Sequence, residues 1–130
     1  MIIEFSESDI LSSKIVNPAW YRVHIESVED RTSKDGQSTN SWIKGKIVFD
    51  ADSGSKEFSG VATPYLWLFN SKGAFAAVGF CACLGMEPGA GKRADLSNAT
   101  GKDLDVFIGN LLVEGTMRNV ITGQYRAPRS

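Results

Sequence analysis

A period-two alternation in residues 20–26 is the feature that most constrains the fold. Tyr21, Val23 and Ile25 are apolar, and polar side chains stand between them. Successive side chains of a β-strand point to opposite faces, so this pattern predicts a strand with one buried face. The chain is therefore expected to build its core against a sheet.

Four further segments carry strand signals and are separated by turn residues. They are residues 41–51, 56–69, 104–113 and 117–126. Pro64 lacks a backbone donor and predicts a break in the second of these segments. One helix is expected between the third and fourth strands of the chain, at Gly73–Leu84, with Gly85 at its end.

This order of elements predicts a mainly β fold, specifically a five-stranded oligonucleotide-binding (OB) barrel with one helix between strands three and four. A small sandwich with a crossover helix has the same elements. The 130 residues suffice for one buried core, so residues 1–130 are expected to form a single domain. Residues 1–18 are predicted to be an irregular lead-in that packs Ile2, Ile3 and Phe5 against that core.

The charge and the cysteine content limit which ligands and which cellular compartment are expected for the chain. Fourteen Lys and Arg against fifteen Asp and Glu give a net charge of −1, so only a local basic patch could attract nucleic acid. Cys81 and Cys83 stand too close along the chain to bridge readily and suit a reducing compartment. Because neither a secretory signal nor a membrane span is evident, the chain is expected in the cytoplasm.

Segment 41–51 carries the candidate binding site. The alternation places Ile43, Ile47 and Phe49 on the buried face of this strand. Trp42, Lys44 and Lys46 then share the outward face, where a ring flanked by ammonium groups can stack a base and hold phosphate. The alternative is that Trp42 packs under a neighbouring loop and that the lysines are ordinary solvated residues.

Other residues would extend this site. Tyr65 and Trp67 on the neighbouring strand would add rings, although Trp67 between two leucines equally suits the core. Arg22, Lys34 and Arg118 would contact phosphates.

Two polar segments are also considered as parts of the site. Residues 30–40 hold an Asp-Gly turn signal and are predicted to be a mobile loop or a hairpin tip, which carries Arg31 and Lys34 and closes over the ligand. Lys92 and Arg93 follow a glycine-rich stretch that departs from the P-loop pattern, so only a basic loop that helps to hold phosphate is considered there.

The sequence offers few residues suited to catalysis or metal binding. His24 is the only histidine, and it is expected on a strand surface. The acidic pairs Asp50 with Asp52 and Asp103 with Asp105 are expected to be turn or surface residues. We therefore expect neither an enzyme nor a metal, cofactor or small-molecule substrate.

The chain also resembles a family of small phage-encoded proteins that are similar to single-stranded-DNA-binding proteins with an OB-like barrel. The resemblance covers about Trp20 to Arg126. Its motifs are Tyr21-Arg-Val-His-Ile25, Ser33-Lys-Asp-Gly36, Trp42–Phe49, Leu66–Asn70, Leu84-Gly85, Gly101-Lys-Asp-Leu104 and Asn119-Val-Ile121 leading to Tyr125.

This resemblance implies a non-catalytic accessory to phage DNA replication or recombination that coats single-stranded DNA in the bacterial cytoplasm. Many bacterial single-strand binders recruit partners through an acidic tail; because the sequence ends Tyr125-Arg-Ala-Pro-Arg-Ser130, recruitment of that kind is not expected. The rival function is a protein-interaction or virion docking module on the same barrel, whose exposed rings would suit a homodimer patch.

Overall fold

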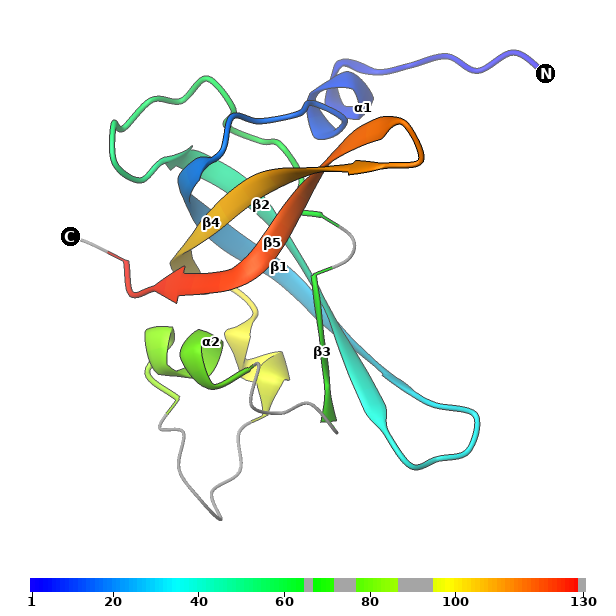
Figure 1. The fold of residues 1–130 in the computed structure, drawn as a ribbon, viewed down its shortest axis with the longest axis vertical. Coiled ribbons are helices and arrows are strands. Elements are labelled where there is room, and N and C mark those ends of the chain that lie inside the picture. Colours follow the sequence, from blue (N-terminus) through cyan, green and yellow to red (C-terminus); the bar gives the residue numbers. More distant parts are fainter. Residues whose placement is uncertain (65–66, 72–76, 87–94, 129–130) are drawn as a thin grey trace.

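The computed structural model describes residues 1–64, 67–71, 77–86 and 95–128. Five antiparallel strands form one sheet in the order β3-β2-β1-β4-β5 (Figure 1). They are β1 (Ala19–Thr32), β2 (Thr39–Asp50), β3 (Leu68–Asn70), β4 (Asp103–Val113) and β5 (Thr116–Arg126). The mainly β class predicted from the alternation is confirmed.

The sheet stays open between its edge strands. Within the described ranges, no backbone pairing joins β3 to β5. Instead Trp67, just before β3, donates its indole Nε1–H to the hydroxyl of Tyr125 on β5 at 3.2 Å. The two rings stack with their centroids 6.4 Å apart. The predicted closed barrel is therefore corrected to a curled sheet whose edges meet through side chains.

The two long hairpins differ in their turns. β1 and β2 continue to a tip between Ser33 and Ser38, whose backbone groups bond at 2.8 Å. The polar segment 30–40 is thus a hairpin tip with strands on both sides. Between β4 and β5, Glu114 and Gly115 both have positive φ, 49° and 79°, as a two-residue type I′ turn requires.

The third strand is shorter than predicted. Residues 57–60 form turns, and Ala62 makes only an isolated bridge with Lys46 of β2. β3 itself begins at Leu68, beyond the predicted break at Pro64. The start of β3 at Leu68 agrees with the predicted break at Pro64, whereas a strand from position 56 up to that break is wrong, since turns interrupt the pairing with β2.

Among the described residues between β3 and β4 there is one α-helix, as predicted. This helix, α2 (Val78–Cys83), ends where Gly85 takes φ 75° and the Met86 amide bonds the Cys81 carbonyl at 2.9 Å. The predicted first residues of the helix, 73–76, lie outside the described residues. A short 3-10 helix, η2 (Leu96–Ala99), leads toward β4.

The lead-in contains a helix that the sequence reading missed. α1 (Glu7–Ser12) begins with a capping box in which Ser6 and Asp9 bond each other's backbone amides. Ile2, Ile3 and Phe5 precede it and are 97%, 60% and 67% exposed, so the expectation that they pack on the core is wrong. The chain before α1 extends away from the sheet (Figure 1).

The core lies on the inner face of the curled sheet. Phe80 of α2 is fully buried there, in ring contact with Trp67, Phe69 and Tyr125. The sheet contributes Tyr21, Val23, Ile25, Ile43, Ile47, Leu104, Val106 and Ile108. The opposite face of β1, β2 and β4 is left to polar and aromatic side chains.

Candidate functional site

The outward face of β2 presents three of the predicted site residues. Ile43, Gly45 and Ile47 are buried, whereas Lys44 and Lys46 are exposed and Trp42 is half-buried. Trp42 pairs across the sheet with Glu29, and Lys46 pairs with His24. The alternation that placed Trp42, Lys44 and Lys46 on one outward face is therefore confirmed.

A shallow hollow surrounds the Trp42 ring. Its volume is about 260 Å³, and it is lined by Glu29, Arg31, Trp42, Ile43 and Lys44. The Arg31 guanidinium carbon lies 5.9 Å from the centre of the indole, within cation–π range. Arg31 belongs to β1, not to a loop, because the strand continues to Thr32.

Carboxylates sit beside the cations of this surface. Glu29 accepts a hydrogen bond from Arg31 Nε at 3.0 Å. This bond lowers the pKa of Glu29, and the nearby charges of Arg31 and Lys44 lower it further. Lys46 Nζ lies 3.5 Å from Glu26. A phosphate that binds here must therefore compete with resident carboxylates, which limits its affinity.

Arg22 lies on the same outward face, but its side chain is more buried than those of Arg31 and Lys46. Its Nε donates to Asp105 at 2.6 Å, and its side chain is 14% exposed. Asp105 is fully buried, and its carboxylate also lies 3.4 Å from Nε of Arg126. The Nη2 atom of Arg126 donates a hydrogen bond to Asp52 at 2.6 Å. The expectation that Asp105 is a turn or surface residue is wrong, because two guanidinium groups satisfy the carboxylate and cover it.

Phe49 faces outward, contrary to the alternation. β2 has one extra residue opposite the step from Arg22 to Val23, so Ile47 pairs with Val23 and Phe49 pairs with Arg22. Such a bulge reverses the faces beyond it. The Phe49 ring consequently lies under Arg22, with the guanidinium carbon 5.1 Å from its centre.

Trp67 does not belong to this surface. Its side chain is 3% exposed and packs edge-on against Phe80. The expectation that Trp67 stacks bases is corrected in favour of the core. Tyr65, the third predicted ring, lies outside the described residues, as do Lys92 and Arg93.

The two remaining predicted cations are spread apart. Lys34 is exposed at the tip of the β1–β2 hairpin, beyond Arg31. Arg118 is half-buried on β5, where it pairs with Leu111, and two strands, β1 and β4, separate it from β2 in the sheet. The structure thus gathers Trp42, Lys44, Lys46 and Arg31, with Arg22 further along the same face.

The side chains considered for acid–base or metal chemistry lie on the surface of β1 and on α2. His24 is on the surface, as predicted, and its Nδ1 lies 2.6 Å from the carboxylate of Asp103. Cys81 and Cys83 are free thiols whose pKa values are raised, chiefly by burial. In the part of the chain that the structure describes, no group of His, Cys, Asp and Glu side chains could hold a metal ion.

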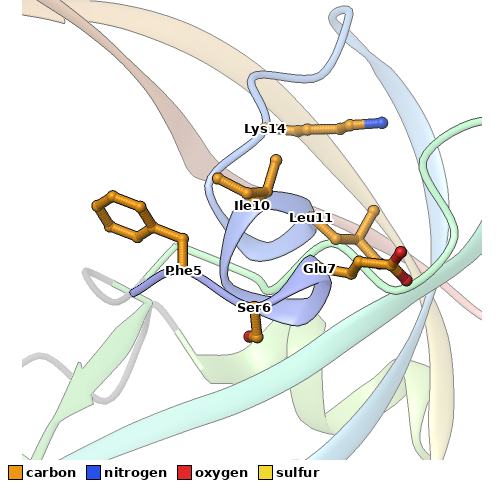
Figure 2. Close-up of a pocket in the computed structure, with 6 residues that line it drawn as sticks. All are labelled: Phe5, Ser6, Glu7, Ile10, Leu11 and Lys14. Atoms are coloured by element: carbon orange, nitrogen blue, oxygen red, sulfur yellow. The ribbon is translucent and has the colours of Figure 1, made fainter. Parts of the chain in front are cut away.

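A second hollow lies on α1, away from the outward face of β2. Its volume is about 450 Å³, and Figure 2 shows side chains that line it, among them Phe5, Ile10 and Lys14. Leu111, Leu112 and Met117 at the β4–β5 hairpin are exposed as well. The chain just after α1 is tied to this hairpin, because Asn119 Nδ2 on β5 donates to the Lys14 carbonyl at 2.9 Å, and Figure 1 draws α1 near the hairpin.

Comparison with protein-family models and with curated proteins finds no match for this chain. The kinship with phage single-strand binders therefore stays a prediction. Among the described residues, no helix has the length and apolar character needed to cross a membrane.

Proposed function

We propose that the outward face of β1 and β2 binds single-stranded DNA with little sequence preference. The observation that carries this proposal is a half-buried indole, Trp42, with Arg31 over its ring and Lys44 on the edge of the same hollow. Stacking on a ring tolerates any base and contributes about 1–3 kcal/mol per base. Lys44 and Lys46 would hold the backbone phosphates.

The fold supports this proposal without requiring a closed barrel. The element order, one helix between strands three and four, and a hairpin extended beyond the ligand-bearing strands are typical of OB-like domains. Together with the sequence resemblance, they favour a non-catalytic role in phage DNA replication or recombination in the bacterial cytoplasm. The chain would bind transient single strands.

Binding should be weak and salt-dependent. If Arg31, Lys44 and Lys46 each neutralise one phosphate, log affinity against log salt should have a slope of about −2 for a single strand. The affinity should be modest because two of these cations are already paired with carboxylates: Arg31 with Glu29, and Lys46 with Glu26.

The test is an anisotropy titration of labelled oligo-dT against the full chain. The variant Lys44→Glu/Lys46→Glu should lose binding at least tenfold. The variant Lys14→Glu/Lys56→Glu has the same change of charge at exposed positions elsewhere and should bind like the wild type. Equal loss in both variants would show that only net charge matters, and equal affinity for duplex DNA would contradict the single-strand preference.

A docking role is the second candidate, favoured by the exposed apolar side chains on α1 and on the β4–β5 hairpin. Here the occupant would be a second copy of the chain, because Phe5 and Ile10 of each copy could fill the hollow on α1 of the other. Sedimentation of the wild type and of Phe5→Asp/Ile10→Asp at 100 μM or more tests this role, with a dimer expected only for the wild type. A monomeric wild type would exclude it.

A further inference from the structure

The outward face of β2 carries a row of four side chains with a ring at each end. Trp42, Lys44 and Lys46 follow the strand period, and the bulge after Ile47 adds Phe49 to the same face. Without that extra residue, Phe49 would point into the core. The row therefore depends on a pairing irregularity.

The two ends of the row are built alike. Arg31 of β1 lies over Trp42, and Arg22 of β1 lies over Phe49, at 5.9 and 5.1 Å from the ring centres. A carboxylate orients each arginine: Glu29 bonds Arg31, and Asp105 bonds Arg22. Because Asp105 is buried and Glu29 is exposed, the Phe49 end is the more rigid of the two.

The stretch between the rings offers phosphate partners. Lys44 is exposed there, and the Lys46 side chain is 48% exposed although paired with Glu26. Phe49 lies seven positions after Trp42; with one residue taken up by the bulge, this corresponds to about 20 Å at ~3.3 Å per residue. That length suits on the order of four nucleotides, the lower end of the site sizes of OB domains.

We propose that Phe49, with Arg22 over it, is a second base-stacking station and that a single strand runs along β2 from Trp42 to Phe49. This inference rests on the proposed function and adds the path and the site size. Phe49 and Arg22 act here as a binding pair, since a half-buried ring and a guanidinium plane are both stacking partners of nucleobases.

The test compares oligo-dT of two, four, six and eight nucleotides with the wild type, Trp42→Leu and Phe49→Leu. Wild-type affinity should rise at least fivefold between dT2 and dT6. Phe49→Leu should abolish most of this rise and lower dT2 affinity by no more than about twofold, because a dinucleotide still binds at the Trp42 end. Trp42→Leu should weaken binding at every length.

Two controls separate stacking from folding. Phe58→Leu makes the same change at a half-buried ring that lies edge-on to Tyr21 in the core, and it should keep the wild-type length dependence. Phe49→Trp should restore the length dependence that Phe49→Leu loses. Melting temperatures of all variants show whether each is folded.

The outcomes distinguish the two proposals. If the wild type binds no oligo-dT, the proposed function fails and the path along β2 fails with it. If the wild type and Trp42→Leu behave as expected but folded Phe49→Leu matches the wild type at every length, the second station is wrong and the proposed function stands.

Discussion

Trp42 and Trp67 come from neighbouring segments of the sheet, yet they lie in opposite surroundings. Trp42 is half-buried on the outward face, with a guanidinium over its ring and Lys44 beside it. Trp67 is enclosed by Phe80 and Tyr125, and its indole N–H is satisfied inside the protein. Trp42 is open to a ligand because its neighbour on the same face of the strand, Lys44, is polar and exposed, whereas Trp67 lies among buried rings.

The largest expected effect is on stability, and it separates the two tryptophans. Trp67→Ala should lower the free energy of unfolding by roughly 3–5 kcal/mol, because it leaves a cavity among buried rings. Trp42→Ala should lower it by about 1 kcal/mol or less. Urea unfolding followed by circular dichroism measures both values, and equal losses would remove the distinction between core and surface.

Binding should show the reverse ranking. Trp42→Ala should weaken oligo-dT binding roughly 5- to 150-fold, which corresponds to the ~1–3 kcal/mol of one stacked base. Trp67→Phe, which keeps a ring in the core, should bind within about twofold of the wild type. Anisotropy titration at fixed salt provides the comparison. A greater loss of affinity in Trp67→Phe than in Trp42→Ala would contradict the assignment of the surface.

The buried rings around Trp67 also make the stability of the protein depend on pH. Burial raises the pKa of Tyr125 to about 12, from the ordinary value near 10. A raised pKa favours the protonated phenol in the folded state, so its contribution to stability is complete below pH 10 and is lost as the pH rises through 12.

The melting temperature of the wild type should therefore fall between about pH 10 and 12. Tyr125→Phe should start lower at neutral pH, since Trp67 Nε1 loses its acceptor, and should decline less over that interval. Part of the decline should persist because the pKa of Tyr21 is raised as well, chiefly by burial. Identical slopes for the two proteins would show that Tyr125 does not supply the effect.

The smallest expected effect is a gain. Glu29→Gln removes the carboxylate that shares Arg31 next to Trp42, so oligo-dT affinity should rise roughly twofold to fivefold, as for a surface ion pair. Glu57→Gln, at an exposed position in a turn that does not line the hollow at Trp42, is the matched control and should have no comparable effect. A loss of affinity in Glu29→Gln would mean that Glu29 supports the site.

Local patterns predicted the parts of the fold that depend on neighbouring residues. The alternation around Val23 and around Ile43 placed β1 and the first part of β2 with the correct faces. Gly85 marked the end of α2. The capping box of Ser6 and Asp9 was also visible, although the lead-in was predicted to be irregular.

The errors come from contacts between segments distant in sequence. Phe49 faces outward because β2 has an extra residue relative to β1, which is a property of the pair of strands. Asp105 is buried because Arg22 and Arg126 approach it from two other strands. Neither partner can be read from the residues around Asp105, so a charged strand residue was expected on the surface.

The most direct test of the central claim follows the indole N–H signals of Trp42 and Trp67 in a ¹⁵N-correlated NMR spectrum during titration with dT8. Trp42→Phe and Trp67→Phe assign the two signals. A base-stacking surface on the outward face of β2 predicts that the Trp42 signal shifts progressively while the Trp67 signal stays in place. An unchanged Trp42 signal at saturating dT8, or a shift confined to Trp67, would contradict it.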